Sequence, residues 1–178
     1  MKIVAIVQAR MGSTRLPDKV MMKINQTPMI ELLINRLSKS KFIDQIVLAT
    51  SKHENNIPLI NHVENLGYKV FIGDENDVLD RYFHAAKMFE ASTVVRITGD
   101  CPLIDSHLVD EVIGGFIDTN ADYASNREPP TYPDGLDVEV ISIKALEEAQ
   151  KKAQKVFQRE HVTPYIINFK KYKFFYLK

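Results

Sequence analysis

Short apolar runs alternate with helical patterns along almost the whole of this 178-residue chain, and this alternation restricts its fold more than any other feature. The first run, 2–7 (KIVAIV), is apolar at nearly every position, as in a strand that is covered on both faces. Between it and the next run, Met29, Leu33 and Leu37 recur at every fourth residue, which is the spacing of one helix face. Strands that alternate with helices predict an α/β fold, with a mostly parallel sheet covered by helices on both faces.

The expected elements follow one another in regular order. The strands are expected at 2–7, 45–50, 68–73, 92–100, 136–142 and 173–178. The helices are expected at 27–37, 57–66, 78–89, 106–117, 143–154 and 158–168. Thr27 and Ser142 are expected to be N-caps, because their hydroxyl groups can accept a hydrogen bond from a free N–H of the first turn. Residues 126–135 hold three prolines and one glycine, so we expect a loop there. No repeat or linker divides the chain, which predicts a single domain over 1–178.

The composition argues against several classes of protein. The chain carries 23 Lys plus Arg and 23 Asp plus Glu, so its bulk charge attracts neither nucleic acid nor a membrane surface. No apolar run approaches the roughly eighteen residues that span a bilayer, and the first residues do not form a signal peptide. The single cysteine, Cys101, excludes an internal disulfide framework. We therefore expect a cytoplasmic protein in which any site for an anion is built locally.

In open α/β sheets ligands bind beyond the carboxyl ends of the strands, so the residues that follow each strand are the first candidates. After the first strand lie Arg10, Ser13, Arg15 and Lys19, around Gly12. A glycine allows backbone N–H groups to approach a phosphate, and cationic side chains neutralise its charge. Because Gly12 is the only glycine there, the patterns of P-loop NTPases and dinucleotide-binding dehydrogenases are both absent. A solvated basic loop is an equally good interpretation of this segment alone.

A carboxylate follows the fourth predicted strand. Asp100 stands where the apolar run 92–100 ends, and Pro102 directs the chain away from the sheet. A carboxylate in this place can bind a divalent cation that itself binds phosphates, although an aspartate that accepts hydrogen bonds within a turn is the alternative. Together with the basic loop after the first strand, Asp100 predicts a site that holds phosphates from two sides.

Two later clusters carry charged side chains. Asp137 and Glu139 are two residues apart on a predicted strand, so their carboxylates should point to one face. Arg159, Glu160 and His161 follow one another, and His161 is a candidate proton carrier or substrate donor. An exposed strand face and an ordinary helix N-terminus are the alternatives for the two clusters. The histidines do not have the spacing of a zinc site.

The order of these segments resembles one known family. The chain has QARMGSTRLPDK where sugar cytidylyltransferases, among them the CMP-sialic acid and CMP-Kdo synthetases, have QARMGSTRLPGK. The later segments GDCPLID, DGLDVEV and REHVTPY are similar to the branch of this family that takes part in spore-coat polysaccharide biosynthesis. The resemblance covers essentially the whole chain. It implies a Rossmann-like three-layer nucleotidyltransferase fold, a homodimer, and Mg²⁺-dependent transfer of CMP from CTP to an acidic or amino sugar.

The resemblance also implies residue roles. The nucleotide-binding residues would be Ala9, Arg10, Ser13, Arg15, Lys19 and Arg81. The catalytic residues would be Arg15, Lys19 and Asp100, with Asp100 as the Mg²⁺ ligand. The sugar-binding residues would be Asp137, Glu139, Arg159 and His161.

The chain departs from the family pattern in three places. Asp18 and Gln26 stand where the family usually has glycine. The family usually continues into a segment like V-D-x-P-E-D, which supplies a second aspartate to the metal, so this chain is expected to be a fragment or a shortened relative without that segment. A nucleotide-binding module without turnover is therefore an alternative to an enzyme. A glycosyltransferase is a weaker one, because such enzymes commonly place Asp-x-Asp at the strand end, where this chain has Pro102.

Overall fold

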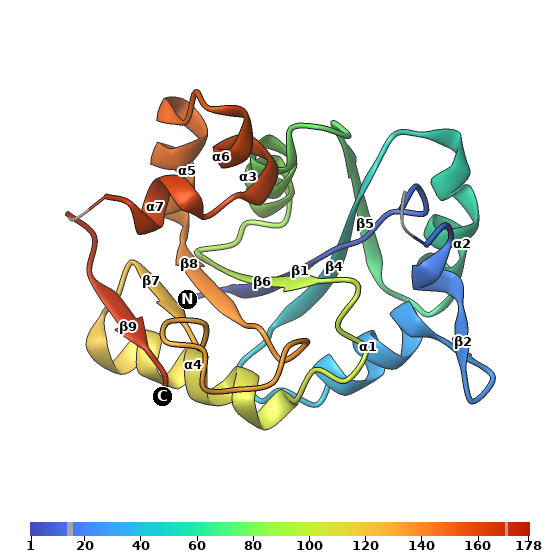
Figure 1. Ribbon diagram of the computed structural model, residues 1–178, viewed down its shortest axis with the longest axis horizontal. Helices are drawn as coiled ribbons and strands as arrows, with labels where there is room; N and C mark the ends of the chain where they lie inside the picture. The colour runs from blue at the N-terminus through green and yellow to red at the C-terminus, as the bar shows by residue number, and fades with distance from the viewer. Residues whose placement is uncertain (14–15, 170) are drawn as a thin grey trace.

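A seven-stranded sheet lies at the centre of the computed structural model, which describes residues 1–13, 16–169 and 171–178 (Figure 1). Its strands are β1 (Ile3–Gln8), β4 (Gln45–Ser51), β5 (Lys69–Gly73), β6 (Thr93–Thr98), β7 (Tyr123–Ser125), β8 (Glu139–Ser142) and β9 (Phe174–Tyr176). They are arranged in the order β5-β4-β1-β6-β8-β7-β9. Only β8 runs antiparallel to its neighbours in this sheet. The predicted α/β fold with a mostly parallel sheet is confirmed.

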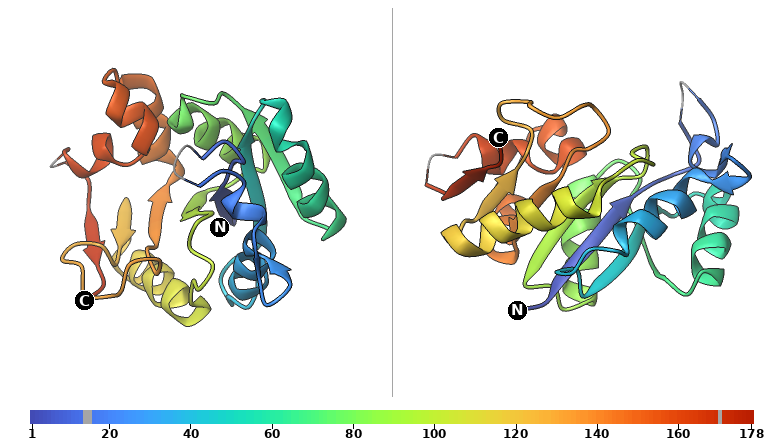
Figure 2. Two further views of the ribbon diagram at one scale, coloured as in Figure 1. Left: turned by 45° about the vertical axis from the view of Figure 1, so that its right-hand side comes forward. Right: turned by 90° about the horizontal axis from the view of Figure 1, so that it is seen from below.

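Helices cover both faces of the sheet, which gives three layers (Figure 2). One face is covered by α1 (Met29–Leu37), α2 (Ile57–Asn65) and α4 (Ser106–Thr119), and the other by α3 (Val78–Met88), α5 (Ile143–Lys152) and α7 (Pro164–Ile167). Successive residues of β1 serve the two faces in turn, since Ala5 packs in the first layer and Ile6 in the second. Double coverage is therefore the reason why β1 is apolar at every position but its last.

The structure corrects the expected helix at 158–168, which is two short helices, α6 (Val156–His161) and α7. Val162 between them has a φ of 69°, outside the helical region, so the backbone cannot continue through it as one helix. Thr27 is not an N-cap either. It belongs to a small strand, and Pro28 takes the N-cap position of α1. Ser142 is confirmed as the cap of α5, because its Oγ accepts a hydrogen bond from the N–H of Ala145 at 3.2 Å.

A two-stranded hairpin, β2 (Lys23–Ile24) and β3 (Thr27–Pro28), lies between β1 and α1 and was not predicted. Its two turn residues, Asn25 and Gln26, have φ values of 48° and 70°. Asp18 likewise has a φ of 58°. Both positions where the chain departs from the family's glycine are therefore left-handed, a conformation that glycine adopts without steric cost.

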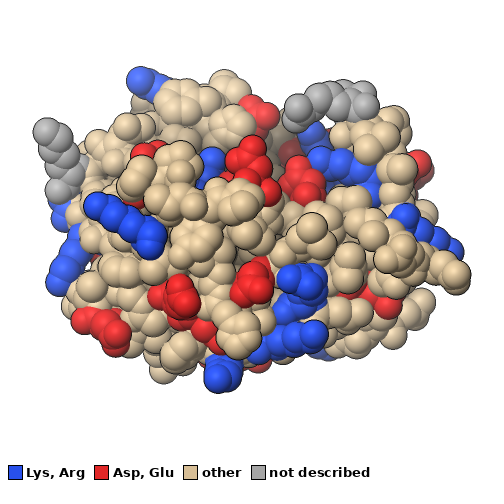
Figure 3. Space-filling model, turned by 60° about the horizontal axis from the view of Figure 1, so that its bottom comes forward, with Lys and Arg blue, Asp and Glu red and all other residues tan. Residues whose placement is uncertain are grey.

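The surface carries no charge field of one sign on the face shown in Figure 3, where cationic and anionic side chains are interspersed. This distribution agrees with the equal numbers of basic and acidic residues in the sequence. Among the residues that the structure describes, no helix has the length and apolar character needed to cross a bilayer.

Candidate active site

A cavity of about 660 Å³ opens beyond the carboxyl ends of β1 and β6. The chain leaves β1 toward β4 and β5 on one side and then crosses to β6 on the other, so the strand order reverses at this point. A crevice forms where the connections diverge, and ligands of open α/β sheets commonly bind there. The sequence-predicted residues that line this cavity, called the main cavity below, are Ala9, Arg10, Ser13, Lys19, Arg81, Asp100 and His161. Arg15, also predicted for this site, lies outside the described residues.

The close approach of β1 and β6 depends on Gly99. Its N–H donates a hydrogen bond to the carbonyl oxygen of Gln8 at 2.7 Å. A Cβ atom at position 99 would lie 2.6 Å from the Cβ of Ala9 and 2.9 Å from that carbonyl oxygen. Glycine is thus required where the two strand ends bring the basic loop and Asp100 to the same cavity.

Asn56, which the sequence analysis did not single out, holds the start of the basic loop. Its side chain is buried, and its Oδ1 accepts a hydrogen bond from the N–H of Met11 at 2.8 Å. Its Nδ2 donates to the carbonyl oxygen and the Oγ of Ser51, at 3.1 and 2.9 Å. All these partners lie at the ends of β1 and β4, so Asn56 connects the loop to the sheet. No signal in the sequence pointed to it, because Asn56 stands at the end of the polar segment 51–56 and only the structure shows that it is buried.

Lys19 and Asp100 form an ion pair at the wall of the main cavity, with 2.8 Å between Nζ and Oδ2. Burial alone would raise the pKa of the Asp100 carboxyl, but the hydrogen bond and charge of Lys19 outweigh it and hold that pKa below its ordinary value. Asp100 is therefore an anion at neutral pH. Half of its side chain remains exposed, so the carboxylate is accessible from the cavity.

The two arginines that line the main cavity differ in their surroundings. Arg10 is about half exposed and forms an ion pair with Glu75 at 3.1 Å. Arg81 is 1% exposed, and its Nη1 donates to the carbonyl oxygen of Asp74 at 2.6 Å. Its Nε–H has no partner among the described residues. Burial lowers the pKa of Arg81, yet a guanidinium remains charged at neutral pH. A buried cation that lines the cavity is suited to an anionic ligand through its charge.

A second cavity of about 400 Å³ adjoins the first, and Arg96, Thr98 and His161 line both. Asp137 and Glu139 line the second cavity, as does Arg127 between them. The Nε of Arg127 lies 3.1 Å from Asp137, and its Nη1 lies 3.8 Å from Glu139. The prediction that Asp137 and Glu139 lie on one strand is corrected, because β8 begins at Glu139 and Asp137 precedes it. The two carboxylates nevertheless converge on one guanidinium.

Glu139 is buried and contacts two further residues besides Arg127. Its Oε2 forms an ion pair with Nη1 of Arg96, and its Oε1 accepts a hydrogen bond from the hydroxyl of Tyr123 at 2.7 Å. Burial alone would raise the pKa of Glu139, but the charge of Arg96 and the hydroxyl group lower it below its ordinary value. Glu139 is therefore a fixed, charged group at the base of the second cavity.

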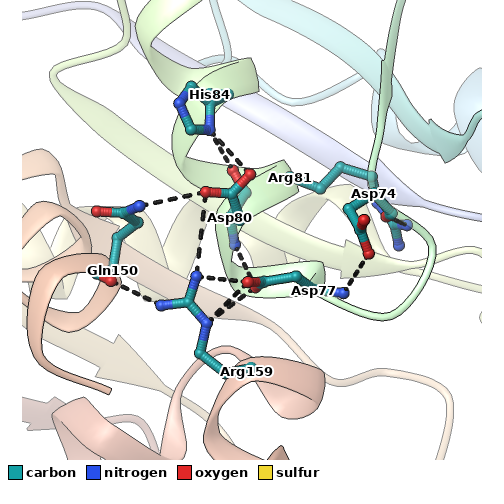
Figure 4. Close-up of polar contacts among 7 residues, drawn as sticks. All are labelled: Asp74, Asp77, Asp80, Arg81, His84, Gln150 and Arg159. Atoms are coloured by element: carbon teal, nitrogen blue, oxygen red, sulfur yellow. Dashed lines mark hydrogen bonds and ion pairs between the residues drawn. The ribbon is translucent and has the colours of Figure 1, made fainter. Parts of the chain in front are cut away.

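Arg159 is not among the residues that line either cavity in the described part of the chain. Its guanidinium donates to both carboxylate oxygens of Asp77, over distances of 2.6 to 3.0 Å, and to the carbonyl oxygen of Gln150 at 2.6 Å (Figure 4). Asp77 is also the N-cap of α3, because its Oδ1 accepts from the N–H of Asp80 at 3.0 Å. The structure thus places Arg159 between α6, α3 and the end of α5, where it connects the elements that carry His161 and Arg81.

Asp100 is the residue through which the main cavity could hold a metal ion. Within residues 1–13, 16–169 and 171–178, no three His, Cys, Asp or Glu side chains are grouped as a metal site. Mg²⁺, however, commonly binds to one or two carboxylates together with substrate phosphates and water, and so does not need a complete protein cage. A half-exposed carboxylate in a cavity lined by several cations fits that mode of binding.

Comparison with known proteins agrees with this geometry. The family model described as cytidylyltransferase matches residues 4–178. The spore coat polysaccharide biosynthesis protein SpsF of Bacillus subtilis is 36% identical over 93% of this chain and 70% of its own length. The 3-deoxy-manno-octulosonate cytidylyltransferase of Chloroherpeton thalassium is 32% identical over 68% of this chain and 48% of its own length.

A solved cytidylyltransferase from Leptospira borgpetersenii superimposes with a TM-score of 0.95 and 34% identity, over 99% of this chain and 76% of that one. The fold, the position of the cavity at the reversal of the strand order and the family match point the same way. The chain belongs to the cytidylyltransferase family.

Proposed function

We propose that this protein transfers CMP from CTP to an acidic or amino sugar and releases pyrophosphate, in the biosynthesis of a surface polysaccharide. The observation that carries this proposal is the main cavity, where Arg10, Lys19 and Arg81 surround a space bordered by Asp100. Such a set of cations suits a triphosphate, and membership of the cytidylyltransferase family favours CTP. The names of the relatives, a polysaccharide biosynthesis protein and an octulosonate cytidylyltransferase, favour a sugar as acceptor.

In the proposed reaction a sugar hydroxyl oxygen attacks the α-phosphorus of CTP. A bond forms between that oxygen and phosphorus, while the bond from phosphorus to the oxygen bridging to the β-phosphate breaks. Pyrophosphate leaves with the electron pair, and the hydroxyl proton passes to a base. His161 is the candidate base because it lines both cavities and would face the junction between nucleotide and sugar. The second cavity would then hold the sugar.

The protein contributes mainly position and charge to such a reaction. In the free protein Lys19 is paired with Asp100. A triphosphate offers Lys19 several anionic oxygens, so we infer that Lys19 exchanges its carboxylate partner for a phosphate when CTP binds. This exchange would leave Asp100 able to hold Mg²⁺ together with the phosphates. The ion would neutralise charge on the phosphates during transfer.

The setting and assembly of the enzyme are also part of the proposal. Cys101 is buried and unpaired among the described residues, which fits a reducing cytoplasm. Family resemblance favours a homodimer, and sedimentation equilibrium would show a mass of about twice the 20.4 kDa of one chain if the proposal holds.

Calorimetric titration with CTP in the presence of Mg²⁺ tests the nucleotide site. We expect saturable binding by the wild type and at least a roughly tenfold loss of affinity in Lys19→Ala and Asp100→Ala. Lys151→Ala is the control, because among the described residues Lys151 pairs with Glu147 on the same helix, α5, outside both cavities, and its loss should not change CTP binding. Unchanged affinity in Lys19→Ala and Asp100→Ala would show that CTP does not bind here.

Release of pyrophosphate tests the reaction itself. The assay would offer CTP with 3-deoxy-manno-octulosonate and a panel of amino sugars, and the same acceptors with UTP. Turnover with CTP alone supports the proposal. Binding of CTP without turnover on any acceptor would favour a nucleotide-binding module instead.

A further inference from the structure

Arg96 lies at the junction of the main and second cavities and was not among the predicted site residues. It is on β6 directly opposite Glu139 of β8, so the two side chains form a cross-strand ion pair. Only 11% of the Arg96 side chain is exposed. Its guanidinium also lies over the ring of Tyr82, at 5.9 Å from the ring centroid. Arg96 is therefore held on two sides while it borders both cavities.

The surroundings of Arg96 leave part of its guanidinium unused. Glu139 contacts Nη1, but Nε–H has no partner among the described residues although it is buried. The Glu139 carboxylate also contacts Arg127 and accepts a hydrogen bond from the hydroxyl of Tyr123, so its two oxygens are not both available to Arg96. A purely structural ion pair would use the planar fork of the guanidinium more completely. Because the Nε–H is itself buried, a ligand would contact an Nη group of Arg96 where this residue borders the two cavities. A cation held in place at the border of a cavity is typical of a group that binds an anion of the substrate.

We propose that Arg96 binds an anionic oxygen at the junction of the two substrates, and that Glu139 positions Arg96 rather than touching the sugar. This inference rests on the proposed function and adds a residue to it. The anionic oxygen has two chemical sources, the α-phosphate of CTP or a carboxylate of the acceptor sugar. Both would lie where the two cavities meet, and both would accept a hydrogen bond from the guanidinium.

Paired substitutions separate this role from a structural one. Arg96→Gln and Glu139→Gln each leave one buried charge without its partner, so each single variant should unfold at a lower urea concentration than the wild type. The double variant removes both charges and should recover much of that stability. If Arg96 touches substrate, the double variant will still turn over at least about 100-fold more slowly. Recovery of turnover together with stability would overturn the proposal.

Binding measurements identify the source of the anion. If Arg96 binds the α-phosphate, the double variant should lose at least about tenfold in affinity for CMP, measured by calorimetry. If it binds a carboxylate, CMP affinity should stay constant while binding of 3-deoxy-manno-octulosonate in the presence of CMP weakens by a similar factor. Unchanged binding of both ligands would contradict the proposal. A wild-type protein that binds no CTP would instead refute the proposed function, on which this inference rests.

Discussion

The ion pair of Arg159 and Asp77 connects α6 to the N-terminus of α3, and we predict that breaking it lowers both stability and nucleotide affinity. Asp77 has two tasks, since it caps α3 and accepts hydrogen bonds from the guanidinium of Arg159. Replacement by Asn separates the tasks, because an amide oxygen can still accept from the N–H of Asp80. Replacement by Ala removes both.

The expected magnitudes follow from these contacts. The side chains of Arg159 and Asp77 are 20% and 34% exposed, so solvent screens their interaction only in part. Hydrogen bonds to charged groups contribute about 1.5–3 kcal/mol, and Asp77→Asn should cost about 2 kcal/mol of the free energy of unfolding. Asp77→Ala should cost about 3 kcal/mol, because loss of an N-cap adds about 1 kcal/mol.

Urea unfolding followed by circular dichroism measures these differences. The matched control is Lys151→Ala, which breaks the ion pair with Glu147 on the neighbouring helix, where the side chains are 64% and 41% exposed. That change should stay within about 0.5 kcal/mol of the wild type. Asp77→Asn should also weaken CTP binding, because α6 carries His161 into the main cavity. If Asp77→Asn were as stable as Lys151→Ala, the reasoning would be refuted.

Three further predictions concern backbone conformation and pH. Gln26→Gly should stabilise the protein by about 0.5–1 kcal/mol in thermal unfolding, because residue 26 has a φ of 70°. Asn25→Gly should change the stability less, because Asn tolerates the left-handed region. Gly99→Ala should destabilise the protein by about 1–3 kcal/mol and weaken CTP binding. Gly114→Ala is the control and should not destabilise the protein, because an added Cβ there meets nothing within 4 Å. Equal effects of the two substitutions would contradict the packing argument. The pKa of Glu139 is lower in the folded protein than its ordinary 4.5, so its contribution to stability is present above pH 4.5 and lost as pH falls through the folded value. Urea midpoints measured from pH 6 to pH 3 should therefore fall less steeply in Glu139→Gln than in the wild type, and parallel curves would count against this role.

Much of the fold follows from the periodicity of the sequence. The buried strand β1 and the helices α1 to α4 lie within a few residues of their predicted ranges, because apolar patterns record which faces of an element are covered. The expected helix at 158–168 failed because local propensity did not show the break at Val162. The strand β7 has only three residues, too few for a periodic signal, and exists because β8 and β9 pair with it.

The sequence by itself determined the chemical character of the site, because cations after the first strand and a carboxylate after the fourth can be read as residue types. Only the tertiary structure decided which side chains share a cavity. Arg159 belongs to a cluster with Asp77, 82 positions away, and Arg96 reaches Glu139 across 43 positions. Such pairings depend on strand order and on the direction of each side chain, which one linear pattern does not contain. Position in the chain therefore identified Lys19 and Asp100. Arg96 became visible only in the tertiary structure, where it borders both cavities and pairs with Glu139 of the neighbouring strand.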